Sequence, residues 1–342
     1  MKAIVYNEYG SPDVLQLESV QKPTPKDNEV LVRIRATTVG YGDLLARNFK
    51  YSRSAFNMPS LFWLPARIAF GYNRPAQRIL GSEFAGEVAA IGKNVTRFKV
   101  GDPVFGYPGA SFGAYAEYLC MREDGLLTIK PADMTDPEAA TIPYGALTAL
   151  SLLRKVAIQP GQRVLINGAS GSIGAAALQL AKHYGAEVTG VCGTPRMDFV
   201  KALGADHVID YTKQDFTQNG QTYDLIVDVL GKCSFSHCRD SLKPEGVLLL
   251  ASFKARQALR MLWTSLTGGK KMICALSSYK PEDLTHIKEL VEAGQIKAVI
   301  DRCYPLEQAA SAHRYVESGA KTANVVIVMG NSRSSVDFPA SG

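Results

Sequence analysis

The first 130 residues contain short runs in which apolar and polar positions alternate. Such alternation is typical of half-buried β-strands, and it occurs over residues 30–36, 83–91, 104–107 and 115–119. Glycine and proline interrupt the runs at close intervals, as turns between strands do. Residues 1–135 are therefore predicted to form a β-rich, barrel-like domain.

The pattern changes after Pro131, where strand-like runs begin to alternate with segments of helical length. Helices are expected over residues 173–184 and 197–203. Strands are expected over residues 163–167, 187–192, 207–209, 225–229, 247–252 and 271–276. Strand and helix in alternation favour a parallel, doubly wound α/β sheet, which places a second domain at residues 136–279.

Residues 280–330 mix the two patterns, with helices expected at 281–293 and 306–318 and strands at 299–304 and 324–328. This piece is expected to return to the first domain. The last residues, 331–342, are rich in serine and include proline and glycine, which predicts a disordered tail.

The composition is that of an ordinary globular protein, with 46% hydrophobic and 20% charged residues and a net charge of +6. Basic and acidic residues are interleaved, so a nucleic-acid partner is not expected. The six cysteines are scattered, which suits thiols in a reducing cytoplasm. The most apolar stretch, 58–72, contains two prolines and an arginine and is shorter than the about 20 residues of a spanning helix, so no transmembrane segment is expected.

A cofactor-binding turn is the strongest local signal. The strand-like Arg163-Val-Leu-Ile-Asn167 is followed by Gly168-Ala-Ser-Gly-Ser-Ile-Gly174 and then by a small-residue helix. This context is typical of dinucleotide binding, although Ala169 stands where the G-x-G-x-x-G fingerprint has its first glycine. The helix N-terminus would face the pyrophosphate. The expected contacts come from Ser170, Gly171, Ser172, Ile173 and Gly174.

The end of the second strand indicates which nicotinamide cofactor is bound. Sites that prefer NAD usually carry Asp or Glu there for the ribose 2′-hydroxyl, whereas this chain has Cys192 followed by Gly193. Thr194 and Arg196 come next, a hydroxyl and a guanidinium that suit a 2′-phosphate, so NADPH is predicted. Two alternatives stay open: Arg196 as a solvated surface residue, and Asp198 as a displaced acidic reader.

Several further motifs, in order along the chain, resemble those of the medium-chain dehydrogenase/reductase superfamily and its zinc-independent, zeta-crystallin-like quinone oxidoreductase branch. They are the opening Met1-Lys-Ala-Ile-Val-Tyr6, residues 79–92, Phe98-Lys-Val-Gly-Asp-Pro-Val-Phe-Gly106, Gly113-Ala-Tyr-Ala-Glu117 and Gly145-Ala-Leu-Thr-Ala149.

The resemblance implies a GroES-like catalytic domain built from both chain ends, a Rossmann domain between them, an active site at their junction, and a dimer or tetramer, of which the homodimer is expected. It also implies that Thr148, Tyr211 and Lys321 help to bind NADP.

The resemblance also bears on metal binding. The positions that match the zinc ligands of related alcohol dehydrogenases are Gly40, Ser82 and Pro143, none of which can ligate zinc. Residues 1–119 contain no cysteine and residues 1–182 no histidine. A local cluster of Cys233, His237 and Cys238 has no visible fourth ligand and is explained more simply by helix packing. No metal is expected.

Without a Lewis acid, a quinone or an α,β-unsaturated carbonyl is the more suitable acceptor of hydride, because its product anion is delocalised. Tyr51 and Tyr41 are candidate proton donors, and Tyr144 is a third tyrosine near the expected cleft. Asp43 is expected to order the cleft by pairing with Arg47 one helical turn later. Tyr51 has the spacing of a donor in a related enoyl reductase motif, but Gly40 replaces that motif's asparagine.

Other functions remain open at this level. The chain can be read as an alcohol dehydrogenase, as an enoyl-thioester reductase, or as a nucleotide-binding protein without turnover, like the crystallins or a trafficking relative of this branch. The aromatic-rich insertion 57–78 can be read as a lid over the substrate, as a docking surface for a membrane or partner, or as core.

Overall fold

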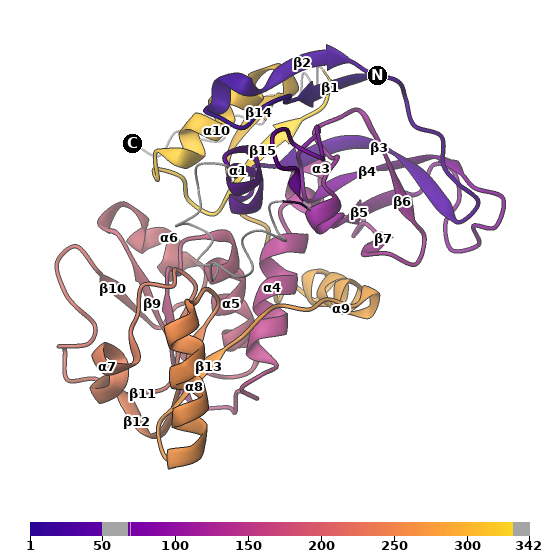
Figure 1. The fold of residues 1–342 in the computed structure, drawn as a ribbon. Coiled ribbons are helices and arrows are strands. Elements are labelled where there is room, and N and C mark those ends of the chain that lie inside the picture. Colours follow the sequence, from indigo (N-terminus) through magenta and orange to yellow (C-terminus); the bar gives the residue numbers. More distant parts are fainter. Residues whose placement is uncertain (50–67, 69, 331–342) are drawn as a thin grey trace.

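The computed structural model describes residues 1–49, 68 and 70–330. Tyr51, most of the 57–78 insertion and the 331–342 tail therefore lie outside the described residues. The chain folds into two bodies, and the colours of Figure 1 show that its two ends meet in the same one. In the described part of the chain, no helix has both the length and the apolar character needed to cross a membrane.

The first body is a β-domain in which strands from both chain ends share one sheet. Its order is β14-β15-β3-β4-β5-β7, with β6 pairing β3, and a separate hairpin joins β1 to β2. The antiparallel pairing of β15 with β3, in which Val326 lies opposite Thr38, joins the C-terminal strands to the N-terminal ones. The strands are β1 (Lys2–Val5), β2 (Gln16–Ser19), β3 (Glu29–Thr38), β4 (Phe84–Ile91), β5 (Pro103–Gly106), β6 (Tyr118–Arg122), β7 (Leu127–Ile129), β14 (Ile300–Pro305) and β15 (Asn324–Val328).

The second body is a six-stranded parallel sheet in the order β10-β9-β8-β11-β12-β13. Counted along the chain this is the 3-2-1-4-5-6 order of a Rossmann fold, whose ligand crevice opens where the order reverses, between β8 and β11. The predicted fold class is confirmed. The strands are β8 (Arg163–Asn167), β9 (Glu187–Cys192), β10 (His207–Asp210), β11 (Tyr223–Asp228), β12 (Leu242–Leu250) and β13 (Lys271–Cys274).

Helices cover the two sheets and join them. In Figure 1, α4 runs between the two bodies, with α5 beside it and α9 on its other side. One apolar core crosses the junction, because Phe105 of β5 and Val164 of β8 belong to the same buried cluster. The helices are α1 (Tyr41–Arg47), α3 (Asp136–Ala140), α4 (Pro143–Leu153), α5 (Ser172–His183), α6 (Met197–Ala202), α7 (Phe235–Cys238), α8 (Ala255–Thr267), α9 (Pro281–Glu292) and α10 (Ala309–Glu317).

Candidate active site

The predicted cofactor turn connects β8 to α5 at the crevice of the parallel sheet. Gly168 has φ +91°, a conformation that side chains rarely adopt, and Gly171 is the N-cap of α5. A Cβ at Gly174 would lie 2.1 Å from the Gly168 oxygen, so only glycine allows this turn to pack on the helix. A Cβ at Gly171 would meet nothing closer than 3.6 Å, which leaves its backbone open to a ligand. The turn, with the free amides of the first helical turn, fits a dinucleotide pyrophosphate.

These two glycines give a testable contrast. Gly174→Ala is expected to lower the melting temperature of the cofactor-free protein, because its methyl group collides with backbone. Gly171→Ala is expected to leave that melting temperature within about 2 °C and to weaken NADPH binding about tenfold, because its methyl group points into the space for the ligand. Calorimetry and a fluorescence titration of both variants check this. Equal loss of stability in both would contradict the assigned roles.

Cationic groups from both bodies meet beside this turn. Arg196, just beyond the end of β9, donates through Nη2 to the Gly319 oxygen. Lys321 donates through Nζ to the Ala323 oxygen at 2.6 Å, and burial lowers its pKa. The side chains therefore converge from two domains, although sequence reasoning derived Arg196 from the strand end and Lys321 only from family resemblance. A guanidinium and an ammonium held in this way suit a phosphate dianion.

Three other residues predicted to contact the cofactor here, Thr194, Tyr211 and Cys192, differ in burial and in hydrogen bonding. The hydroxyl of Thr194 donates to the Asp210 carboxylate, an acidic residue at the end of β10 that sequence reasoning did not consider. Tyr211 is exposed, and its hydroxyl would lie 3.5 Å from a Cβ at Gly193. Cys192 is buried in the core and offers no polar edge to a ribose. Among the predicted contacts, Arg196, Lys321 and Tyr211 carry donor groups that suit a 2′-phosphate.

The turn is also joined directly to the β-domain. The Ala323 amide donates to the Ser170 oxygen at 2.8 Å, and Gly171 forms a parallel bridge with Ala323. Ser172 points elsewhere, since its hydroxyl oxygen would lie 2.6 Å from a Cβ at Gly145 of α4. That oxygen is buried and has no hydrogen-bond partner among the described residues. The backbone amide of Ser172, and not its hydroxyl, is therefore the group that suits the predicted contact with the cofactor.

A buried carboxyl holds the loops on the β-domain side of the junction. Asp43 is fully buried, and it accepts the amides of Gly40 at 2.8 Å and Gly81 at 2.9 Å. Burial raises its pKa to about 7. The expected pairing with Arg47 is wrong: Arg47 pairs with Glu317 instead. Helical spacing allowed the pair, but the two backbone amides satisfy the Asp43 oxygens. Asp43 therefore links the loop at Gly40 to the loop at Gly81, and its role in ordering an active-site cleft stays a prediction.

Glu83 is a second buried carboxyl that sequence reasoning did not single out. It accepts the Thr38 hydroxyl and the Tyr144 amide, the latter at 2.8 Å, and so ties the β-domain to the start of α4. Burial, aided by the nearby Asp43 carboxyl, raises its pKa to about 7. Its contacts come from segments far apart in the sequence, so no local pattern signals them.

The raised pKa of Glu83 predicts a pH dependence of stability. Between its ordinary value of 4.5 and about 7, the folded state keeps a proton that the unfolded chain releases. Stability is therefore expected to fall as pH rises through this window. In Glu83→Gln the fall should shrink, with the part due to Asp43 remaining. Melting temperatures of both proteins at about pH 5 and pH 8 check this. An unchanged slope in the variant would contradict it.

Tyrosines line the junction where α4 begins. The ring of Tyr107 lies 6.1 Å from that of Tyr144 and 5.5 Å from that of Tyr279, between centroids. The Tyr279 hydroxyl is 3.0 Å from that of Thr148, the residue expected to contact the cofactor. Burial raises the pKa of Tyr144, so this phenol stays protonated at neutral pH. Tyr41 stands exposed at the start of α1, close enough to contribute to that rise. Tyr107 and Tyr279 were not predicted: Tyr107 directly follows a family motif that ends at Gly106, but neither that motif nor the sequence around Tyr279 indicates a tyrosine at the site.

Whether the junction could bind zinc depends on the side chains at the positions that match the zinc ligands of related enzymes. Gly40 and Ser82 are neighbours, since a Cβ at Gly40 would lie 3.6 Å from the Ser82 oxygen. Pro143 precedes the residue whose amide binds Glu83, so the three family positions gather here. They offer no imidazole, thiolate or carboxylate, and the donor set does not fit zinc. Within the described residues no group of three or more His, Cys, Asp or Glu has a metal-binding arrangement.

The local cluster of Cys233, His237 and Cys238 belongs to the parallel sheet domain. Cys233 and Cys238 are buried among apolar side chains, and the Cys233 amide donates to the Asp228 carboxylate at 2.7 Å. His237 lies on the outside, with Nε2 3.1 Å from an Asp215 oxygen.

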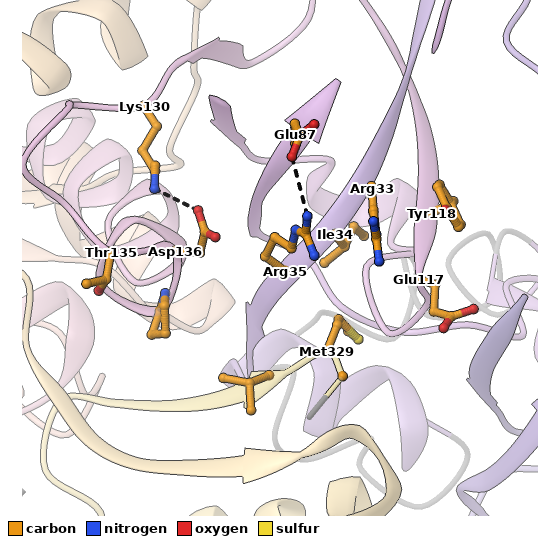
Figure 2. A pocket seen from close by; sticks show the side chains of 13 residues that line it. Arg33, Ile34, Arg35, Glu87, Glu117, Tyr118, Lys130, Thr135, Asp136 and Met329 are labelled. Atoms are coloured by element: carbon orange, nitrogen blue, oxygen red, sulfur yellow. Dashed lines mark hydrogen bonds and ion pairs between the residues drawn. The ribbon is translucent and has the colours of Figure 1, made fainter. Parts of the chain in front are cut away.

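A separate hollow of about 750 Å³ lies on the β-domain, away from the cofactor turn. Figure 2 shows two ion pairs among the side chains that line it: Arg35 pairs with Glu87 at 3.4 Å and Lys130 with Asp136 at 2.7 Å. None of the predicted site residues lines it. The hollow therefore plays no part in the active site described above.

Comparison with known proteins gives the class. An alcohol dehydrogenase GroES-like domain matches residues 26–131, and a zinc-binding dehydrogenase domain matches residues 203–327. The chain is an oxidoreductase with a GroES-like domain and a Rossmann domain. It belongs to the medium-chain dehydrogenase/reductase superfamily, in the quinone oxidoreductase-like branch, as the sequence motifs predicted.

Relatives match over nearly the full length. The chloroplastic quinone-oxidoreductase homolog of Spinacia oleracea is 32% identical, over 96% of this chain and 98% of that protein. The chloroplastic NADPH-dependent alkenal/one oxidoreductase of Arabidopsis thaliana is 29% identical, over 96% of this chain and 79% of that protein. The structure of Escherichia coli quinone oxidoreductase complexed with NADPH superimposes with a TM-score of 0.77 at 25% identity, covering 96% and 100% of the two chains.

Proposed function

We propose that this protein transfers hydride from NADPH to a quinone or to an α,β-unsaturated carbonyl, without a metal. The observation that carries the proposal is the junction itself. A glycine turn fit for pyrophosphate and two cations fit for a 2′-phosphate adjoin a cluster of tyrosines, at a junction whose donor set does not suit zinc. The names of the relatives, a quinone reductase and an alkenal/one reductase that uses NADPH, agree with this acceptor class.

NADPH, when bound, supplies the hydride. Arg196 and Lys321 hold its 2′-phosphate, and the first turn of α5 faces its pyrophosphate. The hydroxyls around Thr148 and Tyr279 position the nicotinamide end and the acceptor. A phenol that remains protonated at neutral pH can donate a hydrogen bond to the acceptor oxygen, and Tyr41 is exposed at this junction. Tyr51 remains a second candidate donor from the sequence.

The test follows NADPH absorbance with a water-soluble quinone and with an enone, each with and without a chelator. Oxidation that survives the chelator is expected for both acceptors. Tyr41→Phe and Tyr51→Phe are then compared. The variant that removes the proton donor should slow enone reduction about a hundredfold and quinone reduction much less, because a hydroquinone oxygen can take its proton from water. Loss of all turnover on chelation would overturn the metal-free proposal, and NADPH binding without turnover would favour a non-enzymatic role.

The homodimer and the cytoplasmic location expected from the sequence stay predictions. Sedimentation of the purified protein tests the first of them.

A further inference from the structure

Helix α8 presents an apolar stripe to the solvent. Leu259, Leu262, Trp263 and Leu266 follow the 3-4 spacing of one helical face, and they are 69%, 58%, 55% and 85% exposed. An amphipathic helix normally turns such a face inward, so a stripe facing outward marks a surface for something else. Figure 1 shows α8 along the sheet domain, at the β13 side.

The opposite face of α8 fixes the helix to the sheet. Thr264 is buried, and its hydroxyl oxygen accepts the Met272 amide at 3.2 Å. The sulfur of Met261 accepts the Cys274 amide at 3.2 Å. These polar contacts hold the inner face of α8 against β13. The helix is therefore stably oriented with its apolar stripe toward the solvent.

The hydrogen bonds from β13 to α8 also limit how a second copy of the chain could bind at this edge of the sheet. Strand β13 lies at the end of the sheet, and the amides of Met272 and Cys274 are the ones that point away from β12. An edge strand with free amides can pair with a second copy of a chain. Here α8 occupies both amides, so the sheet cannot continue into a second copy along this part of its edge.

The segment around the stripe is strongly basic. Between Glu245 and Glu282 the chain has no acidic residue, whereas it has six cations: Lys254, Arg256, Arg260, Lys270, Lys271 and Lys280. The Arg260 guanidinium lies over the Trp263 ring, 4.9 Å from its centroid, which keeps one cation beside the apolar stripe. A symmetric contact between two copies would set this segment against itself and bring like charges together. An anionic, partly apolar partner complements it instead.

We propose that the outer face of α8 docks this protein on the surface of an anionic lipid bilayer. The leucines and the tryptophan enter the boundary between headgroups and acyl chains, and the flanking cations pair with lipid phosphates. At 13 residues the helix is about 20 Å long and lies in the plane of the surface. Four residues separate its first residue from the end of β12, which lies at the crevice edge of the sheet, so docking holds one end of the helix near the mouth of the active site.

The experiment is flotation of the full-length protein with two kinds of vesicle: pure phosphatidylcholine, and the same lipid with about a third phosphatidylglycerol. The protein is expected to float with the anionic vesicles, and less so in about 0.5 M NaCl, which screens the charges. Leu262→Glu/Trp263→Glu should reduce the bound fraction at least about tenfold. Lys254→Gln/Arg256→Gln should reduce it about fivefold for each charge removed.

The matched control is Lys99→Gln/Val100→Glu, which makes the same change of net charge at an exposed turn of the β-domain, where Val100 is 59% exposed. It should float like the unmodified protein. Melting temperatures of all variants show that each is folded, independently of any catalytic activity. A blue shift of the tryptophan emission on anionic vesicles, lost in Trp263→Phe, reports entry of the stripe itself.

Three results would overturn the proposal: no flotation with anionic vesicles, equal flotation with neutral ones, or flotation of Leu262→Glu/Trp263→Glu at the level of the control. Sedimentation gives a further one. If the unmodified protein is a dimer that Leu262→Glu/Trp263→Glu dissociates, the stripe serves a second copy and not a bilayer.

Discussion

Replacing Arg196 and Lys321 together by methionine should raise the dissociation constant for NADPH about a thousandfold and leave that for NADH nearly unchanged. Each cation is expected to contribute about 2 kcal/mol through charge-assisted bonds to a 2′-phosphate, and about 1.4 kcal/mol corresponds to a factor of ten. Methionine keeps most of the volume of each side chain. The two groups come from different domains, so the loss in the double variant also tests whether they act on one phosphate.

Fluorescence titration with both dinucleotides measures this change. Lys182→Met is the control, because Lys182 lies near the far end of α5 and pairs with Asp206. It removes a cation without touching the proposed phosphate site, so its NADPH affinity should stay within about twofold of the unmodified protein. An equal loss of NADH affinity in the double variant would show that the two cations hold the pyrophosphate or the fold, and not the 2′-phosphate.

Arg47→Ala should lower the free energy of unfolding by about 3–5 kcal/mol, the range for removing one partner of a buried ion pair and leaving the other unpaired. Arg47 is 1% exposed and pairs with Glu317. Its Nε donates to the Gly10 oxygen at 3.1 Å, and its Nη1 donates to Nδ1 of His313 at 2.9 Å. Burial holds the pKa of His313 well below its ordinary value, so the ring is neutral and its Nε2 proton faces the Tyr115 oxygen at 3.0 Å.

Chemical denaturation of Arg47→Ala beside Arg314→Ala checks the magnitude. Arg314 lies on the same helix as His313 and pairs with Asp13, but both side chains are exposed, so its loss should cost less than about 1 kcal/mol. If the two variants were equally stable, the buried network would contribute no more than a surface ion pair.

The sequence predicted the parts of this fold that are encoded by local periodicity. Strands β8 and β9 and helix α5 were expected at nearly their observed bounds, because a parallel sheet buries continuous apolar runs beside glycine turns. Helix α8 was not expected, although its leucines have helical spacing. Its apolar stripe faces the solvent and does not pack on the core, unlike the apolar face of an ordinary surface helix.

The site was predictable where a single segment carries it and not where segments converge. The glycine turn and Arg196 follow from one continuous strand-helix-strand segment, β8-α5-β9, and the residues directly after it. Glu83 and Tyr279 act through partners about 45 and 130 residues away in sequence, which no local pattern reveals. The Asp43–Arg47 pairing failed for a related reason: helical spacing made it available, but backbone amides brought in by the fold gave Asp43 better partners.

The pairing of β15 with β3 has a consequence for synthesis on the ribosome. Residues 36–38 of β3 emerge early, but their partners at 326–328 emerge only after the whole parallel sheet domain has been made. That domain is continuous from β8 to β13 and can fold as soon as it leaves the exit tunnel. The β-domain must wait with part of an edge unpaired, the kind of surface that chaperones shield. The nascent chain is therefore most exposed to misassembly in its first domain, which is begun first and finished last.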